Sequence, residues 1–187
     1  MPRKSLPRAR IQGNLDGLCG VYAVVNSVRN LSPKRLKSVE EKELFRQLIA
    51  KLGEEGRLED ALCHGMTVQP LGRLIDCAIE FLKINWGCTI SRRLAFGQAP
   101  EGFQEFWGKI SAHVDDHGPG SVILGLGGKY DHWTCIAKAS ETVLTLIDSD
   151  GIRRLHRKHC TISAAQRSRH HELWPTQTYL LSADASA

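Results

Sequence analysis

A single cysteine stands between glycine-rich turn residues and an apolar run, in the segment Gln12-Gly-Asn-Leu-Asp-Gly-Leu-Cys19-Gly-Val-Tyr-Ala-Val-Val-Asn26. The run predicts a helix that begins at Cys19. The first N–H groups of a helix have no intrahelical partner and carry a partial positive charge, so they stabilise a thiolate beside them. Gly17 and Gly20 leave room for a carbonyl group to approach the sulfur. Cys19 is therefore the predicted nucleophile.

The same segment offers hydrogen-bond donors for the negative charge that develops on a carbonyl oxygen under attack. The backbone N–H of Cys19 is one donor, and the side-chain amide of Gln12 is the predicted second donor. Asn14, or the backbone of the turn at Gly13, is the alternative to Gln12.

A nucleophilic thiol needs a general base, and the chain has eight histidines. His132 is the best placed, because it begins a predicted strand directly after the glycine-rich turn Gly125-Leu-Gly-Gly-Lys-Tyr. The next predicted strand ends in Asp148-Ser-Asp150. If the two strands pair as a hairpin, Asp148 lies near His132 and can orient its imidazole. Asp150 is the competing carboxylate, and Asp148 is preferred.

The elements that position these residues fall into two groups along the chain. Apolar residues at helical spacing predict helices over residues 19–29, 39–52, 67–82 and 100–118, with Thr67 as a cap. Runs rich in β-branched residues predict strands over 122–126, 133–138, 142–147, 152–156 and 176–181. Helices followed by strands indicate an α+β domain in which a mostly antiparallel sheet packs against a helical half.

Length and composition favour one domain. The 187 residues, 42% of them hydrophobic, suit a basic arm over residues 1–11 and a single domain over residues 12–183. No run approaches the roughly 20 apolar residues that cross a bilayer, and the N-terminus lacks the pattern of a signal peptide. A cytoplasmic protein without membrane association is expected, with export by a system that uses no cleavable signal left open.

The net charge of +5 is unevenly placed, since residues 1–15 and 152–171 are basic and contain no acid. Such patches suit a protein partner with an acidic surface, although a solvated hairpin and tail is the simpler interpretation. No nucleic-acid-binding motif accompanies them, so nucleic acid is not the expected partner.

The second basic segment contains side chains of the metal-ligand type close together. They are His156, His159, Cys160, His170 and His171. Their spacing matches no tight zinc pattern, and none of the six cysteines lies in a CxxC pair. No metal or other cofactor is expected.

In residue type and order, the candidate site resembles the papain-like cysteine peptidase superfamily. The closest likeness is to compact bacterial members such as the bacteriocin leader-processing peptidases, with their Gln…Cys-Gly motif. A looser likeness is to the Josephin deubiquitinases, in which Gln, Leu-Cys, a helix bearing Asn and His-Trp follow in the same order. The likeness covers residues 12–26 and about 120–151, whereas residues 30–118 match only as generic helices.

The resemblance implies a papain-like fold with Cys19 as nucleophile, His132 as base, Asp148 as third member and Gln12 as oxyanion residue. The chain differs from papain itself because Gly20 follows the cysteine where papain has tryptophan, and in this it is similar to the bacterial branch. The gap between Gln12 and Cys19 is also a residue or two longer than in these families.

The expected activity is hydrolysis of a peptide or isopeptide bond in a protein substrate, such as a ubiquitin-like tail or a glycine-containing leader. Two alternatives remain open. The same triad would support acyl transfer to an amine, as in transglutaminases, and the fold would also serve as a binding module without turnover.

Overall fold

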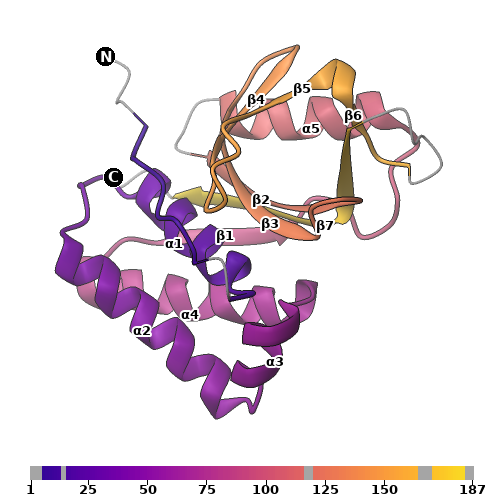
Figure 1. Cartoon of the computed structure of the whole chain (residues 1–187). Coiled ribbons are helices and arrows are strands. Elements are labelled where there is room, and N and C mark those ends of the chain that lie inside the picture. The colour runs from indigo at the N-terminus through magenta and orange to yellow at the C-terminus, as the bar shows by residue number, and fades with distance from the viewer. Residues whose placement is uncertain (1–5, 14–15, 116–119, 164–169, 184–187) are drawn as a thin grey trace.

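The computed structural model describes residues 6–13, 16–115, 120–163 and 170–183. The protein is α+β, with a helical N-terminal half followed by a largely antiparallel sheet (Figure 1). The helical half contains α1 (Cys19–Leu31), α2 (Ser38–Glu54), α3 (Leu58–His64) and α4 (Val68–Trp86). The rest comprises β1 (Ile90–Leu94), α5 (Phe103–Asp115), β2 (Gly120–Gly127), β3 (His132–Ala139), β4 (Val143–Ile147), β5 (Arg154–His156), β6 (Cys160–Thr161) and β7 (His171–Ala183).

The sheet has the strand order β1-β7-β2-β3-β4-β5, and every neighbouring pair in that order is antiparallel. The short strand β6 adds to β7 in parallel. Strands β3 and β4 form the predicted hairpin, with Cys135 opposite Ile147 near its open end. The prediction of a mostly antiparallel sheet is therefore confirmed, and the hairpin brings the start of β3 close to the end of β4.

Strand β2 is buried on both faces and separates two hydrophobic cores. Ile123 belongs to the core that β2 shares with α1, α2 and α4, whereas Val122 and Leu124 pack toward α5. Alternate residues of a strand point to opposite faces, so a continuous apolar run is what a two-sided strand requires. Figure 1 shows the helical half and α5 on opposite sides of these central strands.

The predicted helices over 19–29, 39–52 and 67–82 are all present, with longer bounds. The second was expected to stop at Gly53, but α2 continues to Glu54 and the chain then turns at Gly56, which has a φ of 65°. Helix α4 begins directly after Thr67, although the Thr67 side chain makes no capping hydrogen bond. Helix α5 starts at Phe103 rather than residue 100, and its predicted end at 118 lies outside the described residues.

Three short elements were not predicted: α3, β1 and β6. Each spans seven residues or fewer. Ala61 is the buried residue of α3 and Ile90 that of β1, whereas β6 consists of two buried residues. Periodicity needs several buried positions, so these elements leave almost no pattern. The predicted turn over 125–130 is also partly wrong, because Gly125 to Gly127 belong to β2. In the described ranges, no helix has the length and apolar content to cross a bilayer.

Residues 6–11 of the predicted basic arm pack against the domain instead of extending into solvent. Leu6 and Ala9 contact a small cluster on the sheet formed by Cys135, Ala137 and Ile147. Residues 1–5 lie outside the described ranges.

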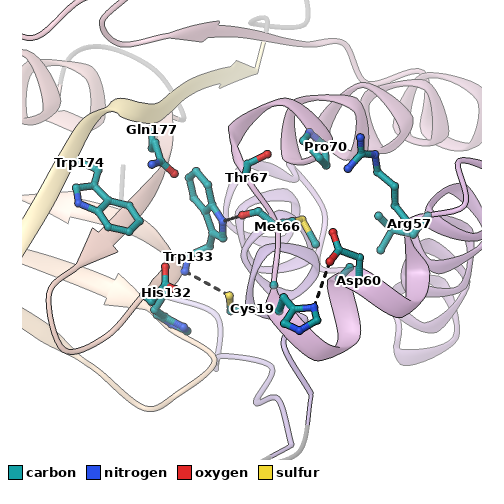
Figure 2. A pocket seen from close by; sticks show the side chains of 15 residues that line it. Cys19, Arg57, Asp60, Met66, Thr67, Pro70, His132, Trp133, Trp174 and Gln177 are labelled. Carbon is teal, nitrogen blue, oxygen red and sulfur yellow. Dashed lines mark hydrogen bonds and ion pairs between the residues drawn. The ribbon is translucent and has the colours of Figure 1, made fainter.

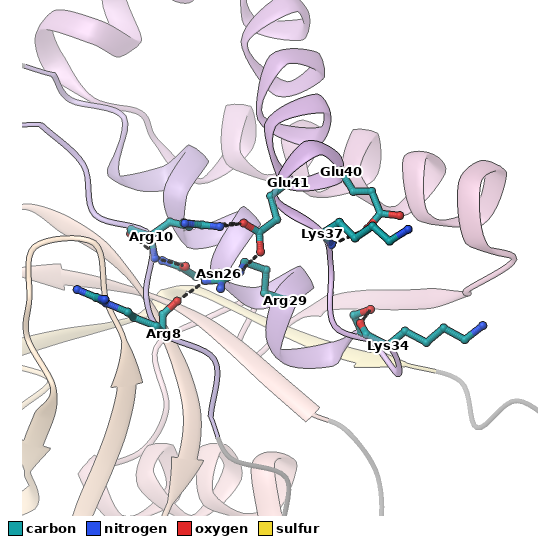
Figure 3. A network of polar contacts seen from close by, with 9 residues as sticks. Arg8, Arg10, Asn26, Arg29, Lys34, Lys37, Glu40 and Glu41 are labelled. Carbon is teal, nitrogen blue, oxygen red and sulfur yellow. Dashed lines mark hydrogen bonds and ion pairs between the residues drawn. The ribbon is translucent and has the colours of Figure 1, made fainter.

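Two polar groups of the helical half hold this arm in place (Figure 3). The Asn26 side chain pairs with the backbone of Arg10, accepting its N–H at 2.9 Å and donating to its carbonyl at 3.3 Å. The buried carboxylate of Glu41 accepts hydrogen bonds from Arg10 at 2.7 Å and from Arg29 at 2.6 Å. The arm is thereby fixed to α1 and α2 a few residues before Gln12.

Replacing Glu41 by Gln should destabilise the protein by roughly 3 kcal/mol, because the largely buried Arg29 guanidinium would lose its counter-charge. Urea unfolding at neutral pH measures the loss. The matched control is Glu43→Gln, which breaks an exposed ion pair with Arg46 and should cost less than about 1 kcal/mol. Equal losses in the two variants would contradict this role of Glu41.

Candidate active site

Cys19 is the first residue of α1, and its side chain lies where the helical half meets the sheet. The residue is buried, with 6% of its surface exposed. Its Sγ accepts the backbone N–H of Trp133 at 3.5 Å and lies 3.8 Å from the carbonyl oxygen of Gly17. The residue before α1, Leu18, supplies no side-chain cap. The first N–H groups of α1 therefore have no competing side chain from the cap position.

His132 and Asp148 form the predicted pair. His132 Nε2 lies 2.7 Å from Asp148 Oδ2, and both side chains are buried. The other carboxylate oxygen, Oδ1, accepts the backbone N–H groups of Asp150 and Ile152, each at 2.9 Å. The carboxylate is thus held from three directions. Asp150 itself is exposed, so the structure favours Asp148 over Asp150 as the partner of His132.

The electrostatics of this pair favour a charged imidazolium. Burial lowers the pKa of His132, but hydrogen bonds and charge attraction from Asp148 and Cys19 outweigh it and raise the pKa from 6.5 to about 10. Burial raises the pKa of Asp148, but the hydrogen bond and charge of His132 outweigh it and hold that pKa below its ordinary value. Because Nε2 is engaged by Asp148, Nδ1 is the nitrogen left for proton exchange with Cys19.

The two neighbours of His132 in the chain, Asp131 and Trp133, help to hold it in position. Asp131 has a φ of 43°, a left-handed conformation that aspartate tolerates better than most residues. The Trp133 indole Nε1 donates to the carbonyl oxygen of Met66 at 2.7 Å. Figure 2 shows this bond joining the sheet to the segment before α4, close to Cys19.

Gln12 is hydrogen-bonded to Ser149, the residue after Asp148, but does not line the cavity at Cys19. Its side-chain Nε2 donates to the carbonyl oxygen of Asp16 at 2.9 Å, and its Oε1 accepts from the Ser149 hydroxyl at 3.1 Å. The backbone N–H of Gln12 also donates to the Ser149 carbonyl. The amide Nε2 has a second hydrogen that could be donated to a substrate oxygen. Because Gln12 does not line the cavity, however, its oxyanion role stays a prediction.

Of the two alternatives to Gln12, Asn14 lies outside the described residues. The backbone N–H of Gly13 is engaged, because it donates to Asp16 Oδ2 at 3.0 Å. Asp16 Oδ1 accepts the backbone N–H of Leu18 at 3.1 Å, so this one carboxylate organises the loop between Gln12 and Cys19. An Asp-Gly pair just before a helix is a known turn signal, and it would have identified Asp16 from the sequence.

A cavity of about 310 Å³ opens beside Cys19. On its helical side it is lined by residues of α2, α3, α4 and the connections between them, and on its sheet side by residues of β3, β7 and the turn before β3 (Figure 2). The helical side consists of Leu52, Arg57, Asp60, Ala61, His64, Gly65, Met66, Thr67 and Pro70, and the sheet side of Asp131, His132, Trp133, Trp174 and Gln177. Sequence reasoning assigned no functional role to Arg57, Trp174 or Gln177.

The histidines of the second basic segment lie near one another. The ring of His159 is 6.4 Å from that of His156 and 5.3 Å from that of His170, measured between ring centroids. Within the described part of the chain, however, no group of three or more His, Cys, Asp or Glu side chains is arranged to hold a metal ion.

The other cysteines differ from Cys19 in their surroundings. Cys135 is buried on β3, and burial raises its pKa to about 11. Burial also raises the pKa of Cys77. Cys63 is exposed on α3, and the histidine that follows it, His64, lies 3.2 Å from Asp60 on the same exposed helix.

Comparison of the chain with models of protein families, with curated proteins and with solved structures finds no match.

Iodoacetamide at about pH 5.5 should alkylate Cys19 before the other cysteines, because the thiolate is stabilised there by the protonated His132. Peptide mapping of the alkylated protein measures the order. Cys63 is the internal control, since it is the exposed cysteine in the described structure. Alkylation of Cys63 at the same rate as Cys19 would contradict the assignment.

The His132–Asp148 pair should also make stability depend on pH. The pKa of His132 is raised in the folded state, so its contribution is complete below 6.5 and is lost as the pH rises through about 10. The difference in unfolding free energy between the wild type and His132→Gln should therefore be larger at about pH 6 than at about pH 11. Urea unfolding at both pH values tests this, and a constant difference would contradict it.

Proposed function

We propose that this protein is a papain-like cysteine peptidase or isopeptidase. The observation that carries the proposal is the meeting of Cys19, at the start of α1, with the buried His132–Asp148 pair on the β3–β4 hairpin. A thiol at a helix N-terminus beside an imidazole oriented by a carboxylate is the arrangement that nucleophilic acyl transfer requires. The nucleophile comes from the helical half and the base from the sheet, which supports a papain-like arrangement.

In the proposed mechanism the Cys19 thiolate attacks the carbonyl carbon, and the carbonyl π electrons move to oxygen. The backbone N–H of Cys19 and the free hydrogen of the Gln12 amide stabilise that oxyanion. As the C–N bond breaks, His132 gives its proton to the leaving amine, and a thioester remains on Cys19. His132 then takes a proton from water, whose oxygen attacks the thioester and releases the acid and Cys19.

The shape of the site supports a slender substrate segment. Cys19 is almost covered, and the Trp133–Met66 hydrogen bond joins the two sides of the cavity close to it. The space beside Gly17 is filled by α3 and is not open to a substrate carbonyl, contrary to the expectation from the sequence, because an added Cβ would lie 2.7 Å from the Ala61 carbonyl oxygen. A glycine-containing tail or leader of a protein substrate fits this narrow approach better than a bulky segment. The basic residues of β5 and its flanks are proposed to favour substrates with an acidic surface.

Cys19→Ala and His132→Ala should each abolish turnover, and the double variant should be little worse, because the two side chains act as a unit. Activity is measured as new N-termini released from a peptide library derived from a whole proteome. Melting curves establish that each variant is folded. A folded and fully active His132→Ala protein would exclude this mechanism.

The choice of the third residue is tested by two Asp→Asn changes. Asp148→Asn should cause a large but incomplete loss of kcat, because the amide favours the wrong imidazole tautomer. Asp150→Asn is the matched control and should have little effect, since its side chain is exposed. Gln12→Ala should lower kcat by about 10²- to 10³-fold, which is the usual effect of losing one oxyanion donor. An inactive Asp150→Asn beside an active Asp148→Asn would reverse the assignment.

Activity should survive chelation by EDTA, because no proposed step uses a Lewis acid. Loss of activity with EDTA and its recovery with zinc would contradict the mechanism and direct attention to His156, His159 and Cys160.

Adding a primary amine to the assay separates hydrolysis from acyl transfer, since acyl transfer yields a product whose mass includes the amine.

A further inference from the structure

Strand β7 contains a bulge that faces the catalytic cavity. In its pairing with β2, Leu124 lies opposite Thr178, but the next residue, Gly125, lies opposite Trp174. Residues 175–177 therefore leave the ladder. The Thr178 hydroxyl donates to the Trp174 carbonyl oxygen at 2.8 Å and closes the bulge. Bulges of this kind commonly redirect side chains next to binding sites.

The bulge is fitted to two glycines of β2. A Cβ added to Gly127 would lie 2.3 Å from Trp174 Nε1, and one added to Gly125 would lie 3.1 Å from Trp174 Cε3 and from Gln177 Cβ. The Trp174 indole thus packs against the backbone of β2 at Gly125 and Gly127, where that strand has no side chains. Its Nε1 donates to Glu172 Oε1 at 3.1 Å, which fixes the ring further. The position of Trp174 is therefore determined by close contacts on its β2 side.

This fixed ring belongs to the sheet side of the catalytic cavity. Trp174 and Gln177 line the same cavity as Cys19, and Figure 2 shows them on the side of His132, away from Arg57. In the proposed mechanism His132 delivers a proton to the leaving amine, so the leaving group departs on the side of His132. The Trp174 wall consequently faces the leaving group, and the α3 wall faces the acyl part of the substrate.

The charges of the two walls differ. Among the residues lining the cavity, Arg57 and the Asp60–His64 pair belong to the α3 side. On the sheet side Asp131 lies next to His132, whose imidazolium loses its own charge when it gives its proton to the leaving amine. The nearby Lys129 lies over the Tyr130 ring, 4.9 Å from its centroid, and does not line the cavity. An indole and a carboxylate that line the same cavity suit a side chain with an apolar stem and a cationic end.

We propose that Trp174, Gln177 and Asp131 form a leaving-group subsite that takes a lysine or arginine side chain on the residue whose amine is released. The stem of that side chain lies on the indole, its charged end pairs with Asp131, and the Gln177 amide hydrogen-bonds its backbone. This subsite rests on the proposed function, because it assigns specificity to the same catalytic cavity.

The sequences of the new N-termini released from the proteome-derived peptide library test the subsite directly. The wild-type protein should release peptides that begin with Lys or Arg more often than the library composition predicts. Trp174→Ala should lower kcat/KM for a lysine-containing peptide about tenfold and remove the preference, while Trp174→Phe should retain much of it. Asp131→Asn, which tolerates the same backbone conformation, should reduce the preference for Lys over norleucine.

Two controls distinguish the subsite from a structural role. The leaving group is gone before the thioester is hydrolysed, so Trp174→Ala should slow formation of the acyl-enzyme and leave its hydrolysis unchanged. Asp150→Asn removes one exposed carboxylate and should leave the preference intact. Cleavage with no preference at this position, or the same preference in Trp174→Ala, would overturn the subsite.

A second measurement needs no turnover and separates failure of the subsite from failure of the proposed function. Lysinamide, which resembles the released product, should protect Cys19 from iodoacetamide at a concentration about fivefold lower than norleucinamide does. Trp174→Ala should abolish this difference, which is measured relative to the alkylation rate of the same variant without ligand. A library that stays uncleaved would contradict the peptidase, whereas equal protection by the two amides would overturn the subsite whatever the activity.

Discussion

The contact between the N-terminus of α1 and the start of β3 is the constraint on which the candidate site depends. The Trp133 N–H reaches Cys19 Sγ across the junction of the two halves, and His132 is the preceding residue. Neither half contains the site alone, because the thiol belongs to a helix and the base to a strand more than 100 residues later. Packing of α1 against Ile123 and Trp133 of the sheet therefore also sets the geometry of the candidate site.

Polar anchors around this junction limit how far its parts can shift. Asp148 is held by His132 and by two backbone N–H groups, so the loop after β4 and the imidazole keep one relative position. Gln12 connects that loop, through Ser149, to the turn organised by Asp16. The arm before Gln12 is in turn fixed to Asn26 and Glu41. The path from α2 to Asp148 thus consists of hydrogen bonds joined by short stretches of backbone.

The sequence was sufficient to predict those features that depend on local pattern. Apolar periodicity located α1, α2 and α4 because each buries several residues on one face, and hairpin geometry placed Asp148 beside His132. Elements with one or two buried residues, such as α3 and β1, gave no such pattern. Trp174 and Gln177 were missed for a different reason. Their place in the cavity results from the register between β2 and β7, which are about 50 residues apart, and no local pattern encodes that register.

Gly125 and Gly127 give the site a means of adapting without any change in the residues that line it. The Trp174 ring lies where it does because these two positions of β2 lack a Cβ. One methyl group at Gly127 would displace the indole, although residue 127 itself does not line the cavity. Alanine or serine there would leave Cys19, His132 and Asp148 in place and still change the shape of the cavity. That shape is therefore set in part by a strand that contributes no residue to the cavity lining.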